Sequence, residues 1–232
     1  AGYHIAVKIL GMADYGAPQS RFRTVVVAAR EFIPTLPEPV FKPEQYRTVR
    51  DAIGKLPPLK AGEKDSKDPM HVTSRHRKET IEILKQVPKN GGNRPYGVGP
   101  KCLDKVAGFY DVYGRLAWDK TAVTITARCR TPSCGRFVHP EQDRGLSVRE
   151  AALLQGFPED FYFEGPFDDK FKQIGNAVSP IFSTVLAGHI LSMLAGKNHA
   201  DMEETISEPT FSSYSGTIAH VKKNKDAKRK DK

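Results

Sequence analysis

Cysteine is scarce in this chain of 232 residues. Cys102, Cys129 and Cys134 form an odd set with no metal-binding spacing, which argues against a disulfide framework or a zinc site and fits a reducing compartment. We also expect no signal peptide and no apolar run long enough to span a membrane. With 39% hydrophobic and 27% charged residues, the composition is that of an ordinary soluble globular protein.

The net charge of +9 is unevenly distributed. Residues 222–232 contain seven Lys or Arg and two Asp, so +5 lies in this tail and +4 in the rest of the chain. Such a tail is typical of a solvated, disordered end, with nucleic-acid binding or nuclear localisation as the alternative. The remaining +4 is compatible with DNA binding but does not indicate it.

The first half of the chain predicts little regular structure beyond two strands. Residues 3–10 and 23–29 are apolar runs joined by a Gly/Pro turn, which favours a pair of strands. Six prolines between residues 30 and 68 predict an extended connector with one short helix near residues 48–56. A longer helix is expected from about residue 75 to residue 87.

Residues 89–140 are rich in Gly, Pro, Asn and Arg, and only short pieces such as residues 122–127 resemble strands. A small, loop-rich β unit with exposed arginines is the expected result. Helices return at residues 146–155, where Ser147 and Glu150 have the spacing of a capping box. A last helix is expected from Ser179-Pro180 to about residue 195.

Two stretches contain side chains suited to chemistry. In "QSRFR", Arg21 and Arg23 are two positions apart, so a strand would project both guanidinium groups from one face. They form either a surface charge pair with phosphate contacts or a rigid clamp for an anion or oxygen. In "QIGNAVSP", backbone N–H groups and Asn176 could hold a carboxylate or a ribose hydroxyl, or the stretch is only a turn that admits the helix.

Taken in order, these stretches resemble the C-terminal part of the DNA cytosine-5 methyltransferases. A Gln-x-Arg-x-Arg element formed by Gln19, Arg21 and Arg23 comes first. A Leu-Ser-x-Arg-Glu-x-Ala helix follows at residues 146–152 with "LQGFP" behind it, and a Gln-x-Gly-Asn-x-Val element stands at residues 173–178. The resemblance extends from about residue 3 to residue 195.

The resemblance implies an α/β fold: the C-terminal part of a Rossmann-like, S-adenosylmethionine-dependent methyltransferase domain with an inserted small, loop-rich β target-recognition domain. The implied divisions are a catalytic-domain strand pair (1–30), the target-recognition domain (31–140), returning catalytic-domain helices (141–196) and a basic, disordered tail (197–232).

The resemblance also implies site residues. In this family the target cytosine is flipped out of double-stranded DNA, a thiolate adds to C6, and the methyl group of S-adenosylmethionine goes to C5. Arg23 would stabilise charge at the cytosine O2 side, and Arg21 would organise the site or nearby phosphates. Asn176 and Ala177 would lie beside the methionine end of the cofactor. Thr124 and Ile125 would lie near the flipped base.

Four arginines of the recognition region are candidate contacts to DNA grooves or phosphates, although each could equally be a solvated loop arginine. They are Arg94, Arg128, Arg130 and Arg136.

Three elements of the family are absent from the sequence: the Pro-Cys-Gln nucleophile, the Phe-x-Gly-x-Gly cofactor turn and the Glu-Asn-Val segment. We therefore predict that the chain alone cannot methylate DNA. It would need an N-terminal half, either in the same longer chain or as a separate subunit, within a bacterial cytoplasmic restriction–modification system. A non-catalytic, sequence-specific DNA-binding module is the alternative.

Overall fold

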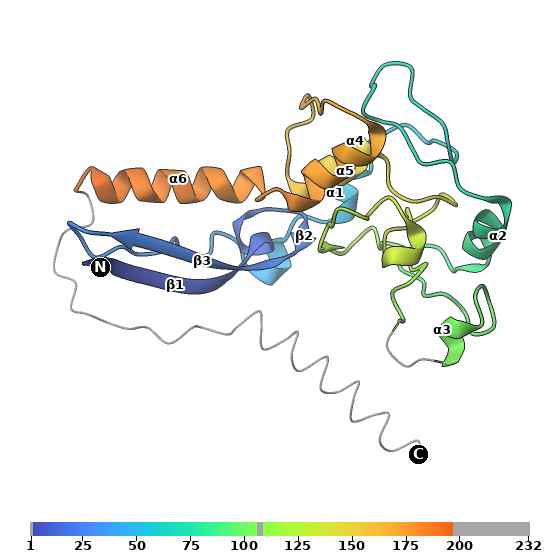
Figure 1. Ribbon diagram of the computed structural model, residues 1–232, viewed down its shortest axis with the longest axis horizontal. Helices are drawn as coiled ribbons and strands as arrows, with labels where there is room; N and C mark the ends of the chain where they lie inside the picture. Colours follow the sequence, from blue (N-terminus) through green and yellow to red (C-terminus); the bar gives the residue numbers. More distant parts are fainter. Residues whose placement is uncertain (1, 106–108, 197–232) are drawn as a thin grey trace, which may run out of the picture.

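The computed structural model describes residues 2–105 and 109–196, and the basic tail lies outside them. The described chain is elongated (Figure 1). At one end, an arm combines β1 (His4–Gly11), β3 (Phe22–Ala29) and α6 (Pro180–Leu194). At the other end, a body of loops and short helices contains the rest of the chain.

Strands β1 and β3 pair antiparallel along their whole length, from His4 opposite Ala29 to Gly11 opposite Phe22. This confirms the two predicted strands. Paired residues share a face of the ribbon, and the face that contains Leu10 and Val25 packs against Phe182 of α6.

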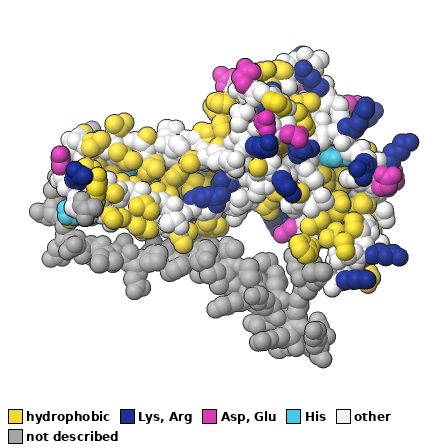
Figure 2. Space-filling view, viewed as in Figure 1, with side chains coloured by type: hydrophobic (Ala, Val, Ile, Leu, Met, Phe, Trp, Pro, Cys, Tyr) yellow, Lys and Arg dark blue, Asp and Glu magenta, His cyan; other side chains and the backbone are white. Residues whose placement is uncertain are grey.

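The opposite face of the ribbon is apolar and exposed. Its side chains Ile5, Val7 and Val26 are 63%, 54% and 58% exposed. Hydrophobic side chains accordingly spread along the arm in Figure 2. A sheet face of this composition is normally covered by another layer.

A parallel bridge joins the arm to the body. β2 (Gln19–Ser20) pairs with β4 (Ala122–Val123), so the chain just before β3 lies beside the end of the predicted recognition region. The strand predicted over residues 122–127 is confirmed only for Ala122 and Val123, and a turn begins at Ala127.

The body contains five α-helices within the described residues, and the three helices predicted at residues 48–56, 75–87 and 146–155 are confirmed at slightly shorter lengths. Three 3-10 turns accompany them. The helices are α1 (Val49–Ile53), α2 (Lys78–Gln86), α3 (Cys102–Lys105), α4 (Val148–Gln155) and α5 (Phe167–Asn176), and the turns are η1 (Met12–Tyr15), η2 (Pro43–Gln45) and η3 (Pro132–Cys134).

Helix α5 is missing from the sequence-based expectation, which placed a loop and a turn there. Phe167, Phe171 and Ile174 recur at helical spacing, and the last two are fully buried. Gly175 and Asn176 suggested a turn, but they form the last residues of the helix. The non-helical link to α6 is residues 177–179.

The stretch Phe167–Leu194 is long and apolar enough, by length and composition, to cross a membrane, so the expectation that no run reaches that length is wrong. The stretch is not one continuous helix, because residues 177–179 separate α5 from α6. Its Phe182 ring packs edge-on against Tyr15, with the ring centroids 5.0 Å apart.

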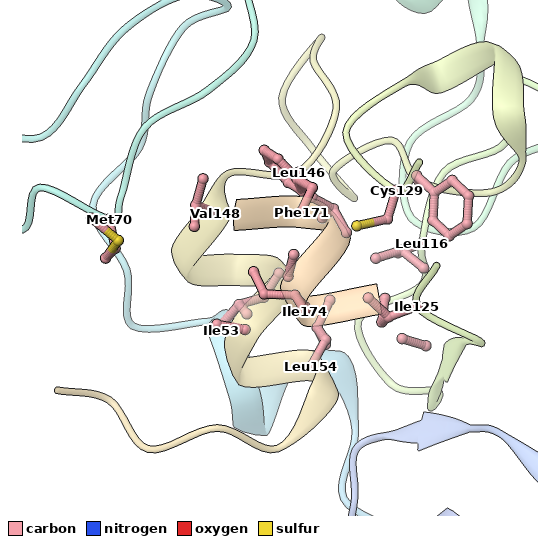
Figure 3. Packing of buried hydrophobic residues seen from close by; sticks show 14 of the residues in the cluster. Ile53, Met70, Leu116, Ile125, Cys129, Leu146, Val148, Leu154, Phe171 and Ile174 are labelled. Carbon is pink, nitrogen blue, oxygen red and sulfur yellow. The ribbon is translucent and has the colours of Figure 1, made fainter. Parts of the chain in front are cut away.

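The largest hydrophobic core mixes segments from both sides of the predicted boundary at residue 140. Ile53, Leu116 and Ile125 from the recognition region pack with Leu154 and Ile174 from the returning helices (Figure 3). Packing is therefore continuous across that boundary.

Buried arginines brace the body, contrary to the expectation that the arginines of this region are exposed. Arg115 is fully buried and donates hydrogen bonds to the carbonyl groups of Leu84, Val87, His139 and Gln142. These bonds connect the C-terminal end of α2 and the segment 139–142 to one guanidinium group.

Helix α4 begins at the predicted capping box. The Ser147 Oγ accepts from the Glu150 N–H at 3.0 Å, and the Glu150 carboxylate accepts from the Ser147 N–H at 2.8 Å. Glu150 also forms two 2.7 Å hydrogen bonds with the buried Arg144. Burial would raise the pKa of Glu150, but the Arg144 guanidinium outweighs it and lowers that pKa to about 2.

Candidate active site

A hollow of about 320 Å³ lies between β3, the 177–179 link and the start of α6. Its walls are mainly apolar, with Met12, Val25 and Phe182 among them. Arg23 and Asn176 add polar groups to the same hollow. A volume of this size is at the small end of the ~300–1,000 Å³ range of ligand pockets.

Arg23 reaches the hollow because of the strand register. It pairs with Leu10, so both side chains lie on the ribbon face that α6 covers. The guanidinium is exposed, and its one hydrogen bond to a described residue runs from Nη1 to the Phe22 carbonyl at 2.6 Å. Most of its donors therefore remain available to a bound group.

Arg21 has a different environment, so the two guanidinium groups do not form the matched pair expected from their spacing. Arg21 is 5% exposed. It donates to the Ile125 carbonyl at 2.9 Å and to the carbonyls of Gly175 and Ala177 at 3.3 and 3.4 Å. Burial, and then the charge of Arg23, lower the pKa of Arg21.

Of the two roles considered for Arg21, its contacts match the organising one. It joins the end of the recognition region to the link that follows α5, and its donors are used by protein carbonyls rather than directed at a phosphate. Both arginines line the hollow, but the Arg21 donors are bound to protein carbonyls, whereas most of the Arg23 donors are free of such bonds among the described residues.

A chain of two buried glutamines makes a second connection between the same segments. The Ile125 N–H donates to Gln19 Oε1 at 3.0 Å, Gln19 Nε2 donates to Gln155 Oε1 at 2.5 Å, and Gln155 Nε2 donates to the Ala177 carbonyl at 2.8 Å. Both glutamine side chains are fully buried.

Gln155 was not among the predicted site residues. Its sequence signal was available: it is a polar residue on the otherwise apolar face of α4 that also contains Val148, Ala151 and Ala152. A buried amide requires hydrogen-bond partners, so its position on that face indicated a specific contact.

Thr124 and Ile125 lie beside the site but in different ways. Thr124 is partly exposed, and its Oγ1 donates to the Ser20 carbonyl at 2.9 Å. The Ile125 side chain is fully buried in the core (Figure 3), so its expected place next to a DNA base is wrong for the side chain. The peptide group of Ile125, in contrast, is the point that Gln19 and Arg21 hold.

Asn176 and Ala177 both border the hollow. The Asn176 side chain is exposed and makes no hydrogen bond to another described residue. The expectation that backbone N–H groups here are free for a ligand is wrong for Ala177, which donates to the carbonyls of Gln173 and Ile174. The Asn176 amide is therefore one group that this element offers to a ligand, and the Ser179 hydroxyl, which is buried beside the hollow without a hydrogen-bond partner among the described residues, is another.

The four candidate DNA-binding arginines fall into two groups. Arg94 pairs with Asp104 at 2.9 Å, and Arg136 pairs with Asp111 at 2.9 Å while also donating to backbone carbonyls, so both guanidinium groups have protein partners. Arg128 is exposed, and its side chain has no partner among the described residues.

Arg130 is intermediate. It is partly exposed, and its ion pair with Asp168, at 2.7 Å, has both side chains in contact with solvent. Arg128 and Arg130 are thus the two whose donors remain accessible.

The cysteines give no nucleophile next to the hollow. Cys129 is fully buried in the core, and burial raises the pKa of its thiol to about 12. Cys102 and Cys134 are exposed, and they belong to α3 and η3 rather than to the elements that line the hollow. A thiol with a raised pKa supplies little thiolate at neutral pH.

The geometry suits a small molecule with an apolar part and a charged or polar end. The apolar walls would bury the apolar part of the molecule. The guanidinium of Arg23 and the amide of Asn176 would bind oxygen atoms at its charged or polar end. This lining fits part of the predicted cofactor, S-adenosylmethionine.

Comparison with known proteins gives a consistent result. The family described as C-5 cytosine-specific DNA methylase matches residues 1–192. Type II methylase M.HgiDII of Herpetosiphon aurantiacus is 40% identical over 84% of this chain and 57% of its own length. Type II methyltransferase M1.HphI of Haemophilus parahaemolyticus is 38% identical over 83% of this chain and 49% of its own.

The chain thus spans about half the length of these two relatives. Among solved structures, one assigned as a DNA modification methyltransferase encoded within a prophage (E. coli) superposes with a TM-score of 0.56. The match has 23% sequence identity and covers 84% of this chain and 62% of that one. At this identity the likeness concerns the fold, which is that of a mixed α/β methyltransferase.

Proposed function

The chain belongs to the C-5 cytosine-specific DNA methylase family, and from this we propose that it forms part of the active site and the DNA-recognition part of a DNA (cytosine-5)-methyltransferase. The substrate is a cytosine flipped out of double-stranded DNA, and the methyl donor is S-adenosylmethionine. The observation that carries this proposal is the exposed guanidinium of Arg23 in a hollow bordered by Asn176.

Each residue at the hollow has a proposed role. When bound, S-adenosylmethionine supplies an electrophilic methyl group. The Asn176 side chain holds its methionine end, and Ala177 lies beside it as part of the wall of the hollow. Arg23 donates hydrogen bonds to the O2 side of the cytosine, where negative charge builds as the ring is attacked. Because a strand holds Arg23, this stabilisation needs little reorganisation.

The thiolate and the remaining cofactor contacts come from an N-terminal half, either in one longer chain or as a separate subunit. Three observations support this division: the Pro-Cys-Gln element is absent from the sequence, the chain spans about half of its relatives' length, and one ribbon face is apolar and exposed. The ribbon would complete the sheet of that half, and α6 would pack beside its cofactor site.

Recognition of DNA is assigned to residues 31–140, with Arg128, Arg130 and Thr124 as the proposed contacts. Arg128 and Arg130 have accessible donors that suit phosphates or guanine edges. The biological setting that fits the two Type II relatives is restriction–modification in a bacterial cytoplasm.

Reconstitution tests the proposal. The 232-residue chain is assayed for transfer of labelled methyl groups from S-adenosylmethionine to DNA, alone and co-expressed with a polypeptide that contains the Phe-x-Gly-x-Gly, Pro-Cys-Gln and Glu-Asn-Val elements. We expect no transfer alone and cytosine-5 methylation after co-expression, with the modified position mapped by bisulfite sequencing. DNA binding without methylation by the pair would instead favour the non-catalytic DNA-binding module.

A further inference from the structure

We propose that Gln155 is a positioning residue that holds the DNA-facing segment and the cofactor-facing link at a fixed spacing. It does so through the glutamine chain, defined as the hydrogen-bonded series Ile125 N–H, Gln19, Gln155 and Ala177 C=O. The terms DNA-facing and cofactor-facing rest on the proposed function. The hydrogen-bonded connection between Ile125 and Ala177 is independent of that function.

The two ends of the glutamine chain fix the orientation of both amides. A backbone N–H can only donate and a carbonyl can only accept, so Gln19 must present its oxygen to Ile125, and Gln155 must present its nitrogen to Ala177. The middle contact then joins Gln19 Nε2 to Gln155 Oε1 at 2.5 Å. Rotation of either amide would place two donors or two acceptors together, and both glutamine side chains are fully buried.

Arg21 joins the same two segments through other atoms. It holds the carbonyl of Ile125 while the glutamine chain holds its N–H, so both polar groups of this residue are bound. At the other end, the Ala177 carbonyl accepts from both Gln155 and Arg21. Cooperative hydrogen bonds of this kind favour one arrangement over its alternatives.

Gly175 brings the two segments into direct contact. A Cβ atom at this position would lie 2.0 Å from the Ala127 nitrogen and 2.2 Å from the Thr126 carbonyl carbon. The backbone after Ile125 therefore rests on the end of α5. A shift of either segment would strain this contact as well as the hydrogen bonds, so we infer that the two move together.

The substitution Gln155→Glu tests the connection with little change in size. A carboxylate at this position still accepts from Gln19, but it faces the Ala177 carbonyl without a hydrogen to donate. A protonated carboxyl group restores that donor. The defect should therefore be largest at high pH and recover as the pH falls. A substitution with a purely steric effect would not depend on pH in this way.

Hydrogen exchange of the 232-residue chain gives the first measurement. We expect the exchange protection of the peptide that contains Ile125 to fall about tenfold in Gln155→Glu relative to the parent chain at the same pH, the scale of one lost hydrogen bond, and to recover in acid. Gln86→Glu is the matched control, because Gln86 is exposed and its amide bonds only to the Glu82 carbonyl of its own helix. Unchanged protection at Ile125 in a folded Gln155→Glu chain would overturn the proposal.

If Gln155→Glu does not fold, the parent chain provides the measurement instead. The carboxamide protons of Gln19 and Gln155 should exchange slowly with solvent by NMR, whereas those of Gln86 should exchange fast. Fast exchange at Gln155 would overturn the proposal. Neither experiment depends on methyl transfer, so failure here is distinguishable from failure of the proposed function.

In the reconstituted enzyme, Gln155→Glu should lower kcat about tenfold or more at high pH, leave the DNA Kd within a few-fold, and regain activity relative to the parent enzyme as the pH falls. Equal loss of DNA affinity and kcat at every pH would assign Gln155 a purely structural role and overturn the proposal.

Discussion

At the scale of single residues, Arg21 and Arg23 differ in burial although only Phe22 separates them. Arg21 binds three backbone carbonyls inside the protein, whereas Arg23 is exposed beside the hollow. We therefore expect Arg21→Ala to lower the free energy of unfolding by roughly 2–4 kcal/mol, because it leaves buried acceptors unsatisfied. Arg23→Ala should change it by less than about 0.5 kcal/mol. Urea unfolding of both variants measures the difference, and equal destabilisation would contradict it.

The same two residues should reverse their importance in catalysis. In the reconstituted enzyme, Arg23→Ala should lower the rate of the chemical step about 10²–10³-fold, the usual effect of removing one donor to a developing oxyanion. DNA affinity should change far less. Single-turnover kinetics and DNA binding measure the two effects separately, with Arg23→Lys retaining the charge as the control. A parallel loss of rate and affinity would assign Arg23 to DNA binding instead.

His139 should make the protein sensitive to mild acid. Burial lowers the pKa of His139 to about 4, and its Nδ1 accepts the N–H groups of Glu141 and Gln142 at 3.1 and 3.0 Å. The pKa in the unfolded chain is about 6.5. As the pH falls, His139 is therefore protonated at a higher pH in the unfolded chain than in the folded protein, and this favours unfolding. Stability is full above pH ~6.5 and decreases by up to roughly 3 kcal/mol as the pH approaches ~4.

Urea midpoints across this pH range test the effect of His139. His139→Gln keeps an acceptor but cannot titrate, so its midpoint should depend less on pH than that of the parent chain. Some dependence should remain, because burial also lowers the pKa of His76, which accepts the Gly145 N–H. An unchanged pH slope in His139→Gln would rule out His139 as its source.

At the scale of secondary-structure elements, two helical glycines give a matched comparison. Gly175 in α5 faces the backbone of Thr126 and Ala127, whereas a Cβ atom at Gly188 in α6 would meet nothing within 4 Å. Alanine favours a helix over glycine by about 1 kcal/mol. Gly188→Ala should therefore raise the free energy of unfolding by about 0.5–1 kcal/mol, while Gly175→Ala should lower it by roughly 2 kcal/mol or more. Thermal or urea unfolding measures whether each variant is stabilised or destabilised. Stabilisation by Gly175→Ala would contradict the close backbone contact.

Helices and strands that are specified by residues close together in the sequence could be predicted. The capping box at Ser147 and Glu150, the proline at the start of α6 and the apolar runs of β1 and β3 each act over a few residues, and the structure contains all of these elements. Helix α5 was not predicted, because Gly175 is a helix breaker by propensity and is required there by the backbone of a distant segment.

The candidate site could be predicted only in part, because several of its residues are placed by contacts with distant segments. Asn176 and Arg23 border one hollow, as their motifs implied. The burial of Arg21 and the contacts of Ile125 and Gln155 depend on residues more than a hundred positions apart in the sequence. Residue spacing along one strand or helix contains no information about such contacts.

At the scale of the whole molecule, the body and the arm differ in how much of their hydrophobic surface is buried. The body buries one mixed core built from the recognition region and the returning helices (Figure 3). The arm covers one face of its ribbon with α6 (Figure 1) and leaves the other face apolar and exposed. An exposed apolar face of this kind is typical of a surface that another layer covers.

The exposed ribbon face therefore predicts self-association of the isolated chain. Val7 and Val26 pair at its centre, and burying each valine side chain is worth about 1.5–3 kcal/mol. Val26→Lys should make the chain monomeric and also prevent assembly with the proposed N-terminal half, because both partners would cover the same face. Val40→Lys is the control, since Val40 is equally exposed, at 58%, but lies outside the ribbon. Sedimentation velocity over a range of concentrations, followed by co-purification with the N-terminal half, measures both effects. A parent chain that stays monomeric throughout, or a Val26→Lys chain that still assembles, would show that this face is not the contact between the halves.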